Sequence, residues 1–142
     1  METDEYQRAL RAIKRARTPT DIRVVAGLLE KAYACGDSRA AYALGTWYFH
    51  GKFFDKDKRN GFRLMLEAAD HFVPSACYDV AVSYELGDGV KKNIQKAVVY
   101  YLRAMMLGDQ QAITEFGRLF YWGIGVSKHR GIAKELLNFR PE

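Results

Sequence analysis

The chain has 142 residues, of which 49% are hydrophobic and 27% are charged, and its formal net charge is +5 at pH 7. This is the composition of a globular protein of about one domain, and it argues against a disordered chain. The sequence has no apolar run approaching the ~18 residues of a membrane-spanning helix and starts with an acidic, polar segment, so we expect a cytoplasmic protein without a secretory signal.

The first third of the chain predicts two helices separated by a proline turn. Apolar residues, among them Leu10 and Ile13, recur at helical spacing and predict a helix over residues 3–17. The segment around Pro19 stops that helix, because the residue before a proline avoids the helical conformation. A second helix is predicted from about residue 22 to residue 35.

From residue 38 onward the sequence repeats itself. Gly51, Gly87 and Gly123 lie 36 residues apart, and each follows a segment of the same apolar pattern. A glycine at this position can adopt the left-handed conformation that ends a helix. The three segments read Ala40, Leu44, Gly45 and Tyr48; Ala76, Val80, Ala81 and Tyr84; and Ala112, Phe116, Gly117 and Phe120.

A constant period of this length predicts a stacked array of helix pairs. We expect an all-α fold, a right-handed α-α superhelix (solenoid) of about four antiparallel helix pairs, in a single repeat domain over residues 1–142. An atypical first and last unit would cover the open ends of the stack. The predicted units are a degenerate capping repeat at 1–36, two repeats at 37–72 and 73–108, and a truncated final repeat at 109–142.

At these residues the sequence resembles the Sel-one-like repeat, a relative of the tetratricopeptide repeat. The third unit carries the closest match, with Ala76, Val80, Ala81, Tyr84, Gly87, Gly89, Val90, Lys96, Ala97, Arg103, Ala104 and Gly108 at the family's positions. The second unit departs from the pattern in its loop, where Phe53 and Phe54 replace glycine and valine, so we expect that loop to fold differently. The resemblance implies a tetratricopeptide-like helical adaptor that binds proteins along its concave face, without catalysis.

The sequence contains no recognisable catalytic or metal-binding constellation. His50, His71 and His129 are isolated from one another, and Cys35 and Cys77 fall in different repeats. A metal site or a serine or cysteine nucleophile requires several such groups at a suitable spacing. We therefore predict a protein that is not an enzyme and needs neither a cofactor nor a metal.

By analogy with the tetratricopeptide unit, the first helix of each pair should line the groove, through positions beside its packing stripe. Aromatic residues and arginine dominate protein interfaces, and several fall at these positions. The alternative is that such aromatics pack between neighbouring helices. The predicted partner-binding residues are Arg39, Tyr42, Thr46, Phe49, Tyr78, Val82, Glu85, Arg118, Tyr121 and Trp122.

The loops inside the helix pairs are rich in basic residues and would stack along one edge of the array. A basic edge can steer an acidic partner or serve only to keep the loops solvated. Nucleic acid is disfavoured as a partner, because no stacking aromatics alternate with these lysines. The predicted basic edge consists of Lys56, Lys58, Arg59, Lys91, Lys92, Lys128 and Arg130.

The sequence therefore predicts a non-enzymatic interaction scaffold that binds a partner protein or peptide in its concave groove. By family analogy, the role would be that of a bacterial toxin-immunity factor or a regulatory adaptor. The alternative function is binding of nucleic acid or another acidic surface through the basic loop edge. The sequence does not specify the partner, and it leaves self-association through the end helices open.

Overall fold

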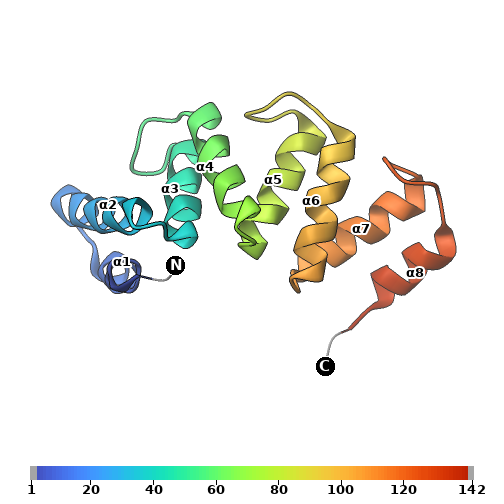
Figure 1. Cartoon of the computed structure of the whole chain (residues 1–142), viewed down its shortest axis with the longest axis horizontal. Helices are drawn as coiled ribbons and strands as arrows, with labels where there is room; N and C mark the ends of the chain where they lie inside the picture. Colours follow the sequence, from blue (N-terminus) through green and yellow to red (C-terminus); the bar gives the residue numbers. More distant parts are fainter. Residues whose placement is uncertain (1–2, 141–142) are drawn as a thin grey trace. The chain divides into compact units, whose positions relative to one another are not determined.

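The computed structural model describes residues 3–140, and every regular element in that range is a helix (Figure 1). The helices fall into two compact units, divided between Val73 and Pro74. Unit 1 contains the first four helices and unit 2 the last four; the single domain expected over residues 1–142 stays a prediction. The eight helices of the described range are α1 (Asp4–Arg15), α2 (Pro19–Ala34), α3 (Ser38–His50), α4 (Lys58–Asp70), α5 (Pro74–Leu86), α6 (Ile94–Met106), α7 (Gln110–Trp122) and α8 (Arg130–Asn138).

Within each unit, consecutive helices pair as the sequence predicts. In unit 1, α1 packs against α2 and α3 against α4, with α2 lying against α3; in unit 2, α5 packs against α6 and α7 against α8, with α6 lying against α7. Helices α3, α5 and α7 are each 13 residues long and begin 36 residues apart. The all-α class and the repeat period are therefore confirmed.

The start of α2 lies three residues earlier than the sequence analysis placed it. Thr18, and not a later residue, is the N-cap: its hydroxyl accepts a hydrogen bond from the Asp21 amide, and the Asp21 side chain accepts one from the Thr18 amide. Pro19 occupies the first helical position, where its missing N–H is not needed. The proline that was interpreted as a stop signal thus belongs to the helix that it begins.

Small residues set the distance between α3 and α4. A methyl group added at Gly61 would lie 2.5 Å from the backbone nitrogen of Phe49 and 2.7 Å from the carbonyl oxygen of Gly45, both on the facing helix. Only a glycine fits this approach. The equivalent positions in unit 2 are Ala97 and Ala133, both buried, so those pairs meet at a small residue that still carries a methyl group.

The loops inside the pairs α3–α4, α5–α6 and α7–α8 share one backbone conformation. Each first helix ends in a left-handed glycine, with φ of 68°, 70° and 68° at Gly51, Gly87 and Gly123. Two residues later a second left-handed residue follows: Phe53 with φ of 66°, Gly89 with 76° and Gly125 with 68°. The hydrogen bonds recur as well, from Lys52 to Trp47, Asp88 to Ser83 and Ile124 to Leu119.

The expectation that Phe53 and Phe54 would change the fold of their loop is therefore wrong. A bulky residue in the left-handed region costs about 1–2 kcal/mol. The Phe53 ring packs edge-on against Trp47 with centroids 4.8 Å apart, and Phe54 contacts both Trp47 and Tyr48. These aromatic contacts offset the backbone strain and keep the loop in the shared conformation.

The close approach at Gly61 gives a stability prediction with an internal control. Gly61→Ala should destabilise the fold by about 1–3 kcal/mol, because the new methyl group meets backbone atoms that cannot yield. Gly27→Ala, inside α2, meets nothing within 4 Å and should stabilise the fold by about 0.5–1 kcal/mol. Urea unfolding of both variants measures these changes, and equal effects would contradict the packing described here.

Candidate functional site

In unit 2 the predicted binding residues Glu85 and Arg118 meet in an ordered ion-pair network. The Arg118 guanidinium donates to both carboxylate oxygens of Glu85, at 2.7 and 2.8 Å, and to Glu115 at 2.7 Å. Tyr101, buried on α6, donates its hydroxyl to Glu85 at 2.7 Å. Burial alone would lower the pKa of Arg118, but its hydrogen bonds to Glu115 and Glu85 raise that pKa above the usual range.

Tyr78 lies beside this network and is half-buried. Its ring meets the Tyr101 ring edge-on, with centroids 6.0 Å apart. Burial raises the pKa of the Tyr78 hydroxyl, so the side chain is neutral at ordinary pH. Val82, between Tyr78 and Glu85 on α5, is also half-buried. The structure thus brings Tyr78, Glu85 and Arg118 together through Tyr101, a residue that the sequence analysis did not single out.

The last turns of α5 and α7 carry large exposed apolar side chains. Leu86 is 68% exposed and Trp122 is 62% exposed, at equivalent positions of the two helices. Tyr121 packs edge-on against Trp122 with ring centroids 4.8 Å apart, and the Arg130 guanidinium lies 4.7 Å from the Tyr121 ring centre. Arg130, assigned to the basic edge, therefore orders an aromatic residue that was assigned to the groove.

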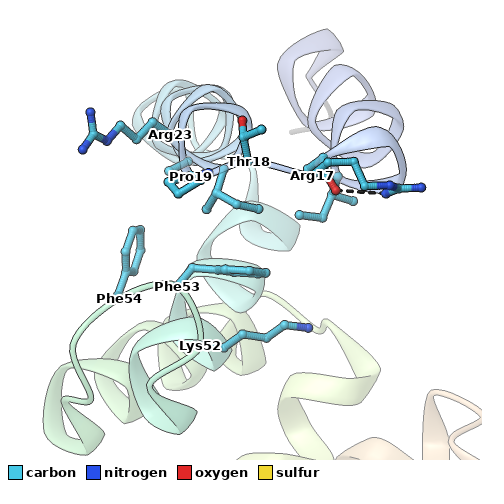
Figure 2. Close-up of a pocket in the computed structure, with 11 residues that line it drawn as sticks. Arg17, Thr18, Pro19, Arg23, Lys52, Phe53 and Phe54 are labelled. Carbon is cyan, nitrogen blue, oxygen red and sulfur yellow. Dashed lines mark hydrogen bonds between the residues drawn. The ribbon is translucent and has the colours of Figure 1, made fainter.

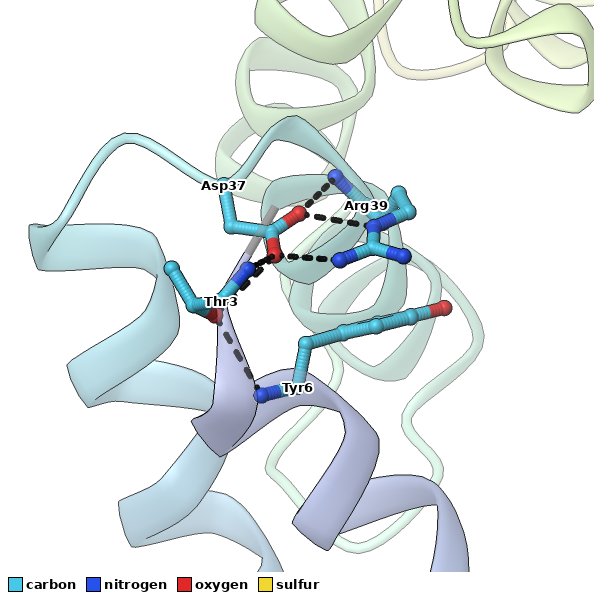
Figure 3. A network of polar contacts seen from close by, with 4 residues as sticks. All are labelled: Thr3, Tyr6, Asp37 and Arg39. Atoms are coloured by element: carbon cyan, nitrogen blue, oxygen red, sulfur yellow. Dashed lines mark hydrogen bonds and ion pairs between the residues drawn. The ribbon is translucent and has the colours of Figure 1, made fainter. Parts of the chain in front are cut away.

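In unit 1 the predicted binding residue Arg39 is held by Asp37, which caps α3 (Figure 3). The Arg39 guanidinium donates to both Asp37 carboxylate oxygens, at 2.8 and 3.0 Å, and its carbon lies 4.2 Å from the Tyr6 ring centre. Thr3 adds a backbone and a hydroxyl hydrogen bond to Asp37, at 2.9 and 3.0 Å. Asp37 is only 1% exposed, so this network ties the start of α1 to the start of α3.

The other predicted residues of unit 1 differ in how much surface they offer. Phe49 is buried, with Lys58 over its ring at 5.3 Å, and so presents little surface to a partner. Thr46 turns its hydroxyl to the Ala43 carbonyl at 2.8 Å. Tyr42 is half-buried. Contact of these residues with a partner stays a prediction.

The basic residues of the loops have a structural role that the sequence analysis missed. Lys56, Lys92 and Lys128 occupy one register, and each stem lies against the left-handed glycine that ends the preceding helix. The Lys58 ammonium lies over Phe49, so this residue is only half-exposed. Arg59, Lys91, Lys92 and Lys128 are exposed. Whether these loops bind an acidic surface stays a prediction.

The helix pairs α3–α4 and α5–α6 coincide with a known repeat. A family model described as "Sel1 repeat" matches residues 38–71 and 74–109. The chain contains two Sel1 repeats. Proteins of this family are generally scaffolds that mediate protein–protein interaction and are generally not catalytic. The resemblance stated from the sequence is thereby confirmed.

Two curated yeast proteins are similar to this Sel1-repeat chain. The chitin synthase regulator SKT5 of Saccharomyces cerevisiae is 34% identical over 82 residues, which cover 56% of the chain and 12% of the relative. Protein SHC1 of Saccharomyces cerevisiae is 33% identical over 97 residues, or 68% of the chain and 19% of the relative. The chain thus spans less than a fifth of the length of these relatives.

Solved structures share the fold. A protective antigen of uropathogenic Escherichia coli with an SLR fold gives a TM-score of 0.85 at 23% identity, covering 93% of this chain and 28% of that chain. A Sel1 repeat protein from Oxalobacter formigenes gives 0.81 at 22% identity, covering 94% and 39%. Helicobacter pylori cysteine-rich protein B gives 0.59 at 27% identity, covering 76% and 82%. These neighbours confirm the all-α helical-repeat fold.

Two further features of residues 3–140 concern metal binding and membrane insertion. Within this range, no three or more histidine, cysteine, aspartate or glutamate side chains gather where they could hold a metal ion. None of the helices described there has both the length and the apolar character needed to cross a membrane.

The Asp37 network makes the stability of unit 1 depend on pH. Burial of Asp37 opposes its charge, but hydrogen bonds from Arg39 and Thr3 outweigh that effect and lower its pKa from 3.8 to about 2. The folded-state pKa lies below the unfolded one, so the stabilisation is present above about pH 4 and is lost as the pH falls through 2. At neutral pH it contributes about 1–2 kcal/mol, reduced by the partial exposure of Arg39.

Asp37→Asn should therefore reduce the free energy of unfolding at pH 7 and flatten its decline between pH 4 and 2. Asparagine keeps the helix cap, so only the charge is lost. Urea unfolding across this pH range measures the effect, with Asp55→Asn as the control at an exposed position of the same unit. An equal decline in wild type and Asp37→Asn would contradict the assignment.

Proposed function

We propose that this chain is a non-enzymatic scaffold that holds a partner protein or peptide on the face formed by α5 and α7. The family supports protein binding in general, and the proposal places the contact on particular residues. In unit 1, Tyr42 on α3 would make a separate contact. The residues of this α5–α7 face are Tyr78, Val82, Glu85, Leu86, Arg118, Tyr121 and Trp122.

The observation that carries the proposal is the exposure of Leu86 and Trp122 next to an ordered charge network. Large exposed apolar side chains are costly in water and mark contact surfaces when they lie together with other interface-type residues. Tryptophan, tyrosine and arginine are the residues that most often dominate binding energy. Here Arg118 and Tyr121 are already fixed, by Glu85 and Arg130, so little side-chain entropy would be lost on binding.

Two biological roles are compatible with such a scaffold, a regulatory adaptor and a toxin-immunity factor. The yeast relative SKT5 is named a chitin synthase regulator, which supports the adaptor role. We therefore favour a regulatory adaptor whose partner is recognised through the α5–α7 face.

Trp122→Ala should weaken capture of the partner by about tenfold or more, because it removes the largest exposed aromatic of the face. The helical circular dichroism signal should not change, since the side chain is 62% exposed. Met106→Ala serves as the matched control: it removes an apolar side chain of the same unit that is 77% exposed, on the second helix of a pair. The measurement is an affinity pull-down with each tagged variant, quantified by mass spectrometry.

Equal capture by Trp122→Ala, Met106→Ala and wild type would overturn the α5–α7 face as the binding surface. Recovery of nucleic acid instead of a protein, lost steeply as salt is raised, would favour the basic loop edge. Charge reversal at Lys91 and Lys128 would then abolish the capture.

A further inference from the structure

Unit 1 contains an apolar cleft, which shares no residue with the α5–α7 face. A cavity of about 760 Å³ opens between the α1–α2 turn and the α3–α4 loop. Phe54 extends from the loop toward the turn at Pro19, and Phe53 lies across the view below that turn (Figure 2). Ile13 and Ile22 line the helical side. The volume lies within the roughly 300–1,000 Å³ that ligand-binding pockets occupy.

The residues around this Phe53–Phe54 cleft carry positive charge only. Arg17, Arg23 and Lys52 line it, and no acidic residue does so within the described range. The Arg17 guanidinium donates to the backbone carbonyls of Lys14 and Ala16 at the end of α1. Arg23, on the first turns of α2, is exposed. The cleft therefore combines an apolar lining with a cationic rim.

The backbone at Phe53 is a second, independent observation. Its φ of 66° falls where the two other loops carry Gly89 and Gly125, and glycine would adopt this conformation without strain. The Phe53 side chain is 47% exposed although it contacts Trp47, so part of its ring still faces solvent. Backbone strain of this kind is often retained at binding sites. Its position at the cleft supports a role of Phe53 in contacting a ligand.

We propose that the Phe53–Phe54 cleft binds an acidic peptide segment of a partner protein. One apolar side chain of the segment would lie against Phe53 and Phe54. Neighbouring carboxylates would pair with Arg17, Arg23 and Lys52, which complement them in charge. An anionic membrane could pair with the cationic side chains of the rim, but a flat surface could not fill a cavity of this volume. A peptide therefore fits the cleft better.

The experiment titrates the full chain into a fluorescein-labelled octapeptide, a phenylalanine–leucine pair flanked by glutamates, and follows anisotropy. Phe53→Gly should weaken binding by about tenfold, because it removes the aromatic wall. It should also preserve the loop, since Gly89 and Gly125 hold the same backbone conformation. Phe72→Gly is the matched control: it replaces another left-handed phenylalanine, φ 64°, of the same unit that does not line the cleft.

The charge is tested in the same assay. Arg23→Glu should weaken binding by about threefold or more, with a loss that shrinks as salt is added. Arg11→Glu reverses an exposed charge of the same unit that does not line the cleft, and should bind as wild type does. A peptide with alanine in place of the apolar pair, and one with lysine in place of the glutamates, should each bind more weakly than the original.

The proposal would be overturned if the wild-type chain did not bind the acidic peptide, or if it bound phosphatidylserine vesicles alone. Equal binding by Phe53→Gly and Phe72→Gly would also overturn it. So would equal binding by Arg23→Glu and Arg11→Glu. Should Phe53→Gly lose its helical signal, the comparison of Arg23→Glu with Arg11→Glu decides the question. The cleft and the α5–α7 face share no residue, so failure here leaves the Trp122→Ala result unaffected.

Discussion

The left-handed turn that ends α3, α5 and α7 is the constraint on which the repeat architecture depends. It reverses the chain within seven residues and returns it to the helix that it has just left. In all three loops a backbone amide then donates to the last turn of the first helix: Asp57 to Tyr48, Asn93 to Tyr84 and His129 to Phe120. The same donor residue caps the second helix. One local conformation thereby sets the pairing of α3 with α4, α5 with α6 and α7 with α8, whereas α1 ends at Ala16 in an extended conformation.

This constraint also determines which side chains stay accessible. One residue directly precedes the left-handed glycine that ends α3, α5 or α7, and it is exposed in all three copies. These residues are His50, Leu86 and Trp122. In unit 2 these positions carry two large apolar residues. The Glu85–Arg118 network next to them adds fixed charge. The proposed α5–α7 face thus lies beside the turn, apart from the packing that holds the helices together.

The repeat period and the ends of α3, α5 and α7 could be predicted from the sequence, because glycine and small residues are required where the chain turns or where helices touch. Gly61 and the three glycines that end the first helices carry that information directly. The conformation at Phe53 could not be predicted, since the contact with Trp47 outweighs the local preference of phenylalanine.

The candidate site could be predicted only in part. Helical spacing placed Tyr78, Glu85 and Arg118 at predicted groove positions. It could not show that Glu85 and Arg118 form an ion pair, because 33 residues of sequence separate them. That pairing depends on how α5 and α7 pack, as does the contribution of Tyr101 from α6. The same holds for Asp37: its cap position is visible in sequence, whereas its burial under Thr3 and Arg39 is a tertiary property.

Site-specific photo-crosslinking tests the central claim of protein binding at the α5–α7 face most directly. A photoreactive phenylalanine analogue would replace Trp122 in one version of the full chain and Met106 in another, both in the native cell. The account predicts a discrete protein adduct from position 122 and none from position 106. Adducts of equal yield from both positions, or an adduct to nucleic acid alone, would contradict it.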